Sequence, residues 1–168
     1  MVSRKIFILF ALGLVVGITV YIWLHHGKND RQLIRGNLRA LGHVISVDPG
    51  EPRKPLLAKI QEVKKLLGNP CELSIDQGGL SGSYSPSEIT NLIMRFQAQV
   101  VEARLSFHDI KIGFPETGMA TITCTGQLQG TTRAHERLDE FRELQIKASK
   151  IDGKWKFIRF QTIEALEK

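Results

Sequence analysis

His108 and Asp109 are the residues of this sequence best suited to acid–base chemistry, and they are adjacent in a segment with strand character. A carboxyl group in an apolar cavity has a raised pKa and suits proton abstraction. Successive side chains of a strand point to opposite faces, so the two cannot act as a direct pair unless a bulge separates them. An aspartate alone in a strand is more often a bulge or edge residue. Tyr84 is the third candidate, although aromatic core packing is the simpler explanation.

Other catalytic and metal-binding arrangements are missing from the sequence. No phosphate-binding loop, nucleophile elbow or helical metal motif occurs, and the spacing of Cys and His residues fits no metal site. Cys71 and Cys124 fall at apolar strand positions, where cysteine packs as a small hydrophobic residue. One disulfide between them stays open, because the sequence does not give their separation. We therefore expect no metal and no cofactor.

An apolar segment from Ile6 to Leu24 precedes these residues. About 19 helical residues at 1.5 Å each span the hydrocarbon core of a bilayer, so the segment is predicted to be a transmembrane helix. Tyr21 and Trp23 suit the membrane interface, and no small-residue cleavage site follows the segment. The predicted parts are a tail over residues 1–5, a transmembrane helix over 6–24 and one domain over 25–168.

Basic residues flank this span on both sides, so charge alone does not fix its orientation. Arg4 and Lys5 precede the span, whereas Lys28 and several arginines follow it. A simple count favours a cytosolic domain, but a short basic amino terminus is typical of a signal-anchor. We expect a single-pass protein of the bacterial inner membrane whose domain faces the periplasm.

Gly13 and Gly17 form a G-x-x-x-G pattern within the span. This spacing lets two helices approach closely, so a dimer through the anchor is a hypothesis. Glycine is also simply common in transmembrane helices.

The chain has a net charge of +6, and the excess of basic residues lies mainly in the first half of the domain. Beside a membrane, such residues attract anionic lipid headgroups at about 1 kcal/mol each. A solvated helical face is the alternative explanation. Nucleic acid is disfavoured as a partner, because aromatic stacking residues do not interleave these charges.

Apolar periodicity and turn residues predict three helices and six strands in the domain. The pattern Ser85-Pro86-Ser87-Glu88 is a capping box with proline at the first helical position, and it predicts the start of the third helix. The predicted helices run from Asn29 or Asp30 to Val47, from Pro55 to a stop at Gly68 and Pro70, and from Ser85 to Ala103. The predicted strands are Cys71 to Ile75, a weak strand through Tyr84, Leu105 to Phe114, Met119 to Gln129, Arg142 to Lys150 and Lys154 to Ile163.

The economical packing of these elements is a curved antiparallel sheet that wraps around the helices. Bulges or bends are expected at Gly126 and between Phe107 and Ile110, where the apolar phase shifts. A cone with a cavity between helices and sheet results. The expected pocket residues are Phe96, Phe107, Cys124 and Trp155.

The element order, the capped helix and the closing hairpin from Ile151 to Phe157 resemble the nuclear transport factor 2-like superfamily, specifically its SnoaL-like branch. The resemblance covers Asn29 to Ile163. It implies an α+β fold, with three helices packed on a curved antiparallel sheet in a cone-shaped domain. In this chain the domain is expected to follow the predicted N-terminal transmembrane helix. It also implies that dimers through the sheet are frequent. The functions of family members range from isomerases and dehydratases to non-enzymatic binding modules.

We therefore expect a membrane-anchored, non-catalytic module that binds a protein or a small ligand, because no acid–base pair is predicted to point into the cavity. One alternative is an isomerase- or dehydratase-type enzyme with a small apolar substrate, using Asp109 or His108 with Tyr84. The other is a sensor of anionic lipid surfaces. The expected partners are the lipid bilayer, a second copy of the chain through the anchor or the sheet, and a partner protein.

Overall fold

The structure is a computed structural model of the 168-residue chain, and it describes residues 29–50, 56–75 and 79–163. The chain divides into two compact units, residues 1–34 and 35–168, which are described separately. Within the described ranges no helix is long and apolar enough to cross a membrane. The predictions that fall outside the described residues are the tail over 1–5, the span over 6–24 and its residues Ile6, Gly13, Gly17, Tyr21 and Trp23.

Residues 35–168 form an α+β unit whose elements follow nearly the predicted order. Helix α2 (Leu56–Leu66) is followed directly by strand β1 (Leu67–Ile75), and helix α3 (Pro86–Gln99) is followed directly by strand β3 (Val100–Glu116). Helix α3 therefore ends before the predicted Ala103, because the β-branched pair Val100 and Val101 favours a strand. The elements are α2 (Leu56–Leu66), β1 (Leu67–Ile75), β2 (Leu80–Tyr84), α3 (Pro86–Gln99), β3 (Val100–Glu116), β4 (Met119–Thr132), β5 (Arg137–Ile151) and β6 (Lys154–Thr162).

A further helix covers residues 29–45, and the boundary between the two units falls inside it. In the second unit, Leu38 and Leu41 of this helix are buried, while Arg39 and His43 are exposed. One face of the helix is therefore apolar and buried, and the opposite face is polar and exposed. The helix ends two residues before the predicted Val47, because Val47 pairs with strand β3 instead.

Six strands form one sheet in the order β2-β1-β6-β5-β4-β3. Strands β3 to β6 pair antiparallel in sequence order, as predicted. The prediction of a wholly antiparallel sheet is wrong at one pair, because β1 runs parallel to β6. A long crossover makes this parallel pairing possible, since all the elements from β2 to β5 lie between the two strands in the chain.

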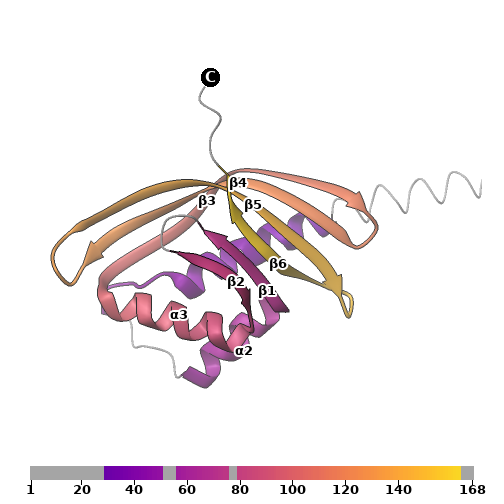
Figure 1. The fold of residues 1–168 in the computed structure, drawn as a ribbon. Coiled ribbons are helices and arrows are strands. Elements are labelled where there is room, and N and C mark those ends of the chain that lie inside the picture. Colours follow the sequence, from indigo (N-terminus) through magenta and orange to yellow (C-terminus); the bar gives the residue numbers. More distant parts are fainter. Residues whose placement is uncertain (1–28, 51–55, 76–78, 164–168) are drawn as a thin grey trace, which may run out of the picture. The chain divides into compact units, whose positions relative to one another are not determined.

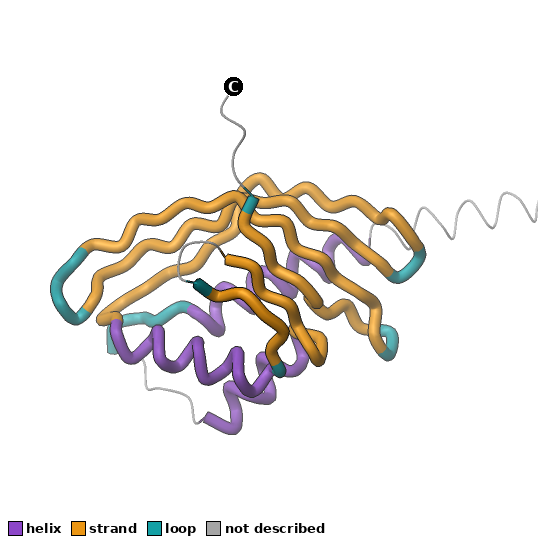
Figure 2. Tube along the Cα trace, in the orientation of Figure 1, coloured by secondary structure: helices purple, strands orange, loops and turns teal. Residues whose placement is uncertain are grey.

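The sheet is curved, and α2 and α3 lie on its concave side (Figure 1). Buried and half-buried residues alternate along β4, where Ala120, Ile122 and Cys124 are buried. Residues of β5 and β6 complete this layer, with Ile146 and Phe157 almost fully buried. The long strands, orange in Figure 2, extend beyond the helices to their turns. One apolar core therefore lies between the helices and one face of the sheet.

Helix α3 starts at the predicted capping box. The Ser85 hydroxyl accepts a hydrogen bond from the Glu88 N–H (3.3 Å), and the Glu88 carboxylate accepts one from the Ser85 N–H (2.7 Å). These hydrogen bonds lower the pKa of the Glu88 carboxyl, since they stabilise its charged form. Pro86 occupies the first turn, where a missing N–H costs nothing.

Strand β3 carries a bulge in the predicted place. Its register against β4 shifts between His108 and Lys111, and Asp109 adopts φ 52° in the left-handed region. The extra residue explains why the apolar phase of the sequence shifts at this point.

No bulge occurs at Gly126, one of the two positions where a bulge or bend is predicted. Pairing continues without a shift from Gly126 to Phe107 on one side and to Arg142 on the other. The glycine instead makes room for its neighbour, because a Cβ atom there would lie 2.9 Å from Cδ1 of Leu144.

Candidate functional site

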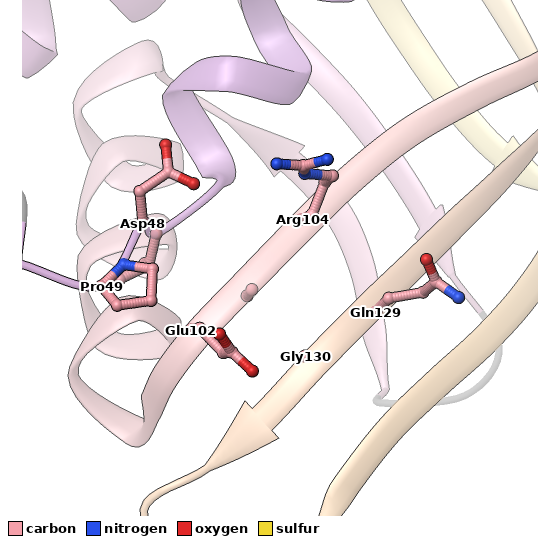
Figure 3. A pocket seen from close by; sticks show the side chains of 8 residues that line it. Asp48, Pro49, Glu102, Arg104, Gln129 and Gly130 are labelled. Carbon is pink, nitrogen blue, oxygen red and sulfur yellow. The ribbon is translucent and has the colours of Figure 1, made fainter.

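A groove of about 300 Å³ opens where the chain leaves the first helix and passes beside strand β3 (Figure 3). Strand β3 is an edge strand, so the groove lies at the border of the sheet. We call it the β3 groove. Its lining residues are Val47, Asp48, Pro49, Glu102, Ala103, Arg104, Gln129 and Gly130.

Backbone pairing holds the outer wall of the β3 groove against the sheet. The Val47 N–H donates to the Ala103 carbonyl (2.7 Å), and the Ala103 N–H donates to the Val47 carbonyl (3.0 Å). The Ser46 hydroxyl accepts from the Leu105 N–H (3.0 Å). Pro49 has no N–H and cannot continue this pairing, so the chain diverges from β3 and leaves the groove open.

The side chain of Gln97 holds the C-terminal end of the first helix in place through hydrogen bonds. Its side-chain amide donates to the carbonyls of Val44 (2.9 Å), Ile45 (3.0 Å) and Ser46 (3.2 Å). Its amide oxygen accepts from the Lys59 ammonium of α2. These carbonyls have no partner within their own helix, so one buried side chain from α3 satisfies the helix end and positions the groove wall.

Arg133 ties the turn between β4 and β5 to the end of α3. Its side-chain Nε donates to the Ala98 carbonyl (2.7 Å), and its backbone N–H donates to the Gln99 carbonyl (2.9 Å). This turn directly follows the β4 segment that contributes Gln129 and Gly130 to the β3 groove. Both sides of the groove are thus attached to helix α3.

The polar side chains of the β3 groove fall into two kinds. Glu102 and Gln129 already have partners, since Glu102 accepts from the Thr131 hydroxyl (3.2 Å) and Gln129 donates to Asp139 (3.2 Å). Asp48 and Arg104 are exposed and make no hydrogen bond or ion pair within the described part of the chain. Figure 3 shows them on different walls of the groove. They are the groups left open to a ligand.

The predicted catalytic candidates do not come together in the sheet. His108 and Asp109 are both exposed on edge strand β3, and His108 Nε2 lies 3.0 Å from the Ser106 hydroxyl. The bulge that a direct pair would require is present, but it leaves the Asp109 carboxylate in solvent. Tyr84 is half-buried on β2, the strand at the opposite edge of the sheet.

The expected pocket residues lie in or near the core, and none of them lines the β3 groove. Cys124 and Trp155 are buried, whereas Phe96 and Phe107 are half-buried. The Trp155 ring packs against Phe114 with centroids 5.8 Å apart. Its indole N–H is buried and has no hydrogen-bond partner among the described residues.

Both cysteines are free thiols, so the disulfide that the sequence left open is not formed. Burial raises the pKa of the Cys71 thiol to about 12, and the nearby Glu72 charge adds to this shift. Burial raises the pKa of the Cys124 thiol to about 11. Both thiols therefore stay protonated and unreactive near neutral pH.

Few polar side chains reach the interior. In the described ranges, Thr90 and Gln97 are the buried polar residues, and no carboxylate or imidazole is buried with them. The Thr90 hydroxyl donates to the Pro86 carbonyl of its own helix (2.7 Å). The described interior thus holds amide and hydroxyl groups that are satisfied within the fold.

Sequence reasoning missed the β3 groove and its support. A signal existed for Gln97, which follows Ile89 and Ile93 at intervals of four and so lies on the buried face of α3. A glutamine on such a face must find hydrogen-bond partners. The groove itself could not be predicted from the sequence. It depends on the pairing of Val47 with Ala103, which lie 56 positions apart in the chain, and no local pattern encodes such a pairing.

No protein-family model matches this chain, and no curated protein matches it. Solved structures do match. The Kfla4162 protein from Kribbella flavida is 10% identical with a TM-score of 0.69, and the match covers 81% of this chain and 90% of that one. A nuclear transport factor 2-like protein with a cystatin-like fold from Novosphingobium aromaticivorans is 13% identical with a TM-score of 0.67, covering 86% and 87%.

An enzyme is also among the matching structures. The hexachlorocyclohexane dehydrochlorinase LinA-type3 from Novosphingobium barchaimii is 10% identical with a TM-score of 0.64, and the match covers 81% of this chain and 86% of the enzyme. At such identities the likeness concerns the fold alone. The chain therefore has a nuclear transport factor 2-like α+β fold, and the resemblance noted in the sequence is confirmed at that level.

Proposed function

We propose that this protein is a non-catalytic binding module, held at a membrane by its N-terminal segment, whose β3 groove receives a segment of a partner protein. The observation that carries the proposal is the groove itself, which presents one unpaired carboxylate and one unpaired guanidinium on walls fixed by backbone hydrogen bonds. Preorganised walls lower the entropy cost of binding.

The placement of the ionisable residues supports binding over catalysis. His108 and Asp109 are exposed, and Tyr84 lies at the other edge of the sheet. A general base needs a position within hydrogen-bond reach of its substrate, usually in a pocket that excludes water. The β3 groove instead combines an edge strand, an open polar lining and backbone walls, which suits an extended polypeptide.

Photo-crosslinking from the groove tests the proposal. A photoreactive phenylalanine derivative replaces Gln129 in the full-length chain, expressed in its own membrane. The matched control places the same residue at Ser83, which is exposed on β2 at the opposite edge of the sheet. We expect a discrete protein adduct from position 129 and none from position 83. Equal labelling from both positions, or none from either, would contradict the proposal.

The second candidate is an enzyme of the isomerase or dehydratase type with a small apolar substrate. It is favoured by the shared fold of the dehydrochlorinase, a protein named for elimination chemistry. In this chain it would use Asp109 or His108 with Tyr84. Turnover of a small apolar substrate that is lost in both Asp109→Asn and Tyr84→Phe, while both variants stay folded, would establish this alternative over the binding module.

A further inference from the structure

The first helix, over residues 29–45, carries basic side chains along its exposed face. Arg35, Arg39 and His43 follow one another at intervals of four, so they lie along one side of the helix. All three are exposed, and we call them the basic stripe. The sequence has no aspartate or glutamate from position 31 to position 47. Between these positions the helix itself therefore supplies no carboxylate that could neutralise the stripe.

The packing of this helix fixes the direction in which the basic stripe points. Leu38 is fully buried in the core, and the Asn37 side-chain amide donates to the Trp155 carbonyl of β6 (2.8 Å). At Gly42 the helix lies so close to strand β3 that a Cβ atom there would lie 2.7 Å from the Leu105 carbonyl oxygen. The helix therefore cannot turn about its axis, and its basic side stays exposed.

Strand β3 extends this positive surface. The Arg35 guanidinium donates to the Ile110 carbonyl (3.3 Å), and because a guanidinium carries several N–H donors, others stay available. Lys111, the residue after Ile110, is exposed. Asp109 is the carboxylate closest to them in the chain, and it forms no ion pair within the described ranges. With Arg39, the cationic groups outnumber this carboxylate, so the surface is positive.

The apolar segment from Ile6 to Leu24 comes just before this helix in the sequence. Residues 25–28 alone separate the two. With the apolar segment in a bilayer, as proposed, the basic stripe follows the membrane within about 20 residues, the range over which basic side chains respond to it. The phosphate groups of anionic lipids attract such side chains. The position of the stripe in the sequence thus favours lipid over nucleic acid as the source of phosphate.

The contact that this surface can make with a bilayer is electrostatic. A basic amphipathic helix usually binds a membrane by burying its apolar face among the lipids. Here the apolar face is already used, because Leu38, Leu41 and Val44 lie in the core. Only the charged side remains for the membrane, so the attraction must depend on lipid charge and weaken as salt is added.

We infer that the basic stripe, together with Lys111, docks on the phosphate groups of anionic lipids and holds the domain in one orientation at the bilayer surface. This inference rests on the membrane tether of the proposed function, because the tether brings the helix to the headgroups. It does not depend on what the β3 groove binds.

Quenching by lipid headgroups in nanodiscs tests the inference on the full-length chain. A fluorophore is attached at Ala40→Cys, an exposed position beside Arg39, and in the control at Ser83→Cys on β2. The native Cys71 and Cys124 are buried and do not compete for the label. The nanodiscs hold phosphatidylcholine alone or with an equal part of phosphatidylglycerol, and both contain the same small amount of a lipid with a nitroxide headgroup. We expect quenching at position 40 to be at least about twofold stronger in the anionic nanodiscs, and quenching at position 83 to be the same in both.

Charge removal and salt identify the groups responsible. Arg35→Gln with Arg39→Gln should lower the quenching at position 40 in anionic nanodiscs to its level in neutral ones. The matched control, Lys64→Gln with Lys65→Gln, removes the same charge from exposed positions of α2 and should leave the quenching unchanged. About 1 M salt, which shortens the Debye length to about 3 Å, should abolish the lipid preference of the unaltered chain. Equal quenching in both lipids, or an equal loss in both doubly substituted chains, would overturn the inference.

A single-stranded oligonucleotide tests the competing source of phosphate. If it binds the chain in neutral nanodiscs through Arg35 and Arg39, while the label at position 40 shows no lipid preference, the stripe takes nucleic acid and the inference fails.

The inference and the proposed function can fail separately. A chain that does not insert into nanodiscs would overturn the tether, and flotation with vesicles of the same two compositions then tests the stripe. Flotation with the anionic vesicles alone, lost in Arg35→Gln with Arg39→Gln, would support the stripe, and no preference for the anionic vesicles would overturn it. The adduct at position 129 reports on the β3 groove whatever the lipid charge.

Discussion

Asp109 lies at a bulge of strand β3 with φ 52°, a backbone conformation that β-branched residues rarely adopt. Aspartate and asparagine tolerate it, because their short polar side chains can hydrogen-bond locally. The side chain is exposed, so packing does not hold the residue in place. The residue type at position 109 therefore fits a backbone requirement, and the chain needs no catalytic role to account for it.

Substitutions at position 109 should follow backbone preference. We expect Asp109→Gly to leave the free energy of unfolding unchanged or to raise it slightly, and Asp109→Val to lower it by about 1–2 kcal/mol. Urea unfolding followed by circular dichroism measures both. A valine variant as stable as the parent would show that the left-handed conformation is not required at the bulge.

The buried thiols of Cys71 and Cys124 make the free energy of unfolding depend on pH in the alkaline range. The unfolded thiols titrate near pH 9, whereas the folded thiols have pKa values of about 12 and about 11. A raised folded pKa means that the folded state holds its protons more tightly than the unfolded state. The resulting stability is fully present below pH 9 and is lost as the pH rises towards 11 and 12.

The free energy of unfolding should therefore fall between pH 9 and pH 11. Other groups also titrate in this range, so the test is the difference between the parent chain and the double variant Cys71→Ala with Cys124→Ala. We expect the variant to be less stable at pH 8, because two buried sulfur atoms are lost, and to lose less stability on going to pH 11. Parallel pH profiles for the two proteins would contradict the assigned pKa shifts.

The sequence predicts individual residues well where the determinant is local. The Ser85 and Glu88 capping box and the burial of Cys71 and Cys124 all follow from neighbours within a few positions. That Asp48 and Arg104 lack side-chain partners among the described residues cannot be predicted in this way, because it depends on which residues of other strands come close to them.

Side chains that donate hydrogen bonds to the carbonyls at helix ends join the elements of this fold. Gln97 of α3 holds the last carbonyls of the first helix, and Arg133 from the β4–β5 turn holds the last carbonyls of α3. Helix ends that lack such partners leave unsatisfied carbonyls, at a cost of about 1–3 kcal/mol for each buried group. These two residues therefore set where strand β3 and the segment before Pro49 can lie.

Removing the Gln97 amide should loosen the wall of the β3 groove. We expect Gln97→Leu to lower the free energy of unfolding by about 2–3 kcal/mol, because the carbonyls of Val44, Ile45 and Ser46 lose the amide that donates to them. Amide exchange at Val47 should also accelerate, since its bridge to Ala103 loses support. The matched control Gln99→Leu, at an exposed position of the same helix, should change stability by less than about 0.5 kcal/mol. Equal losses in both variants would contradict the role of Gln97.

Strand β3 also shows how a long sheet edge avoids pairing with other chains. The bulge at Asp109 disrupts its ladder, the Arg35 guanidinium donates to the Ile110 carbonyl (3.3 Å), and Pro115 offers no N–H. Lys111 adds charge between them. Such features discourage edge-to-edge association. The β3 groove lies at the other end of the strand, where Val47 rather than a bulge covers the edge.

The sequence predicted the existence and order of the elements better than their ends. Hydrophobic periodicity and turn residues placed the helices and strands of the described ranges. However, α2 and α3 run directly into strands without a loop, and no glycine or proline marks the change at Val100. The parallel pairing of β1 with β6 was also beyond local reasoning. It depends on residues such as Leu73 and Phe160, which lie 87 positions apart.

At the scale of the whole molecule, we propose that the segment from Ile6 to Leu24 tethers the proposed binding module to a membrane. That segment is long and apolar enough to span a bilayer, and the described unit over residues 35–168 has its own core. A tether raises the local concentration of a binding module near membrane partners. The β3 groove would then meet segments of proteins held at the same surface.

Membrane attachment should depend on the apolar segment alone. We expect the full-length chain to remain in the membrane fraction after extraction at high pH, because burying about 19 apolar residues far outweighs the cost of insertion. A variant that lacks residues 1–25 should move to the supernatant and keep the circular dichroism spectrum of its sheet. The control replaces Gly13 and Gly17 with leucine, which keeps the span apolar and should leave attachment unchanged even if it reduces self-association. A truncated chain that stays with the membrane would instead point to the basic surface of the helices, where Lys64 and Lys65 are exposed, as the anchor.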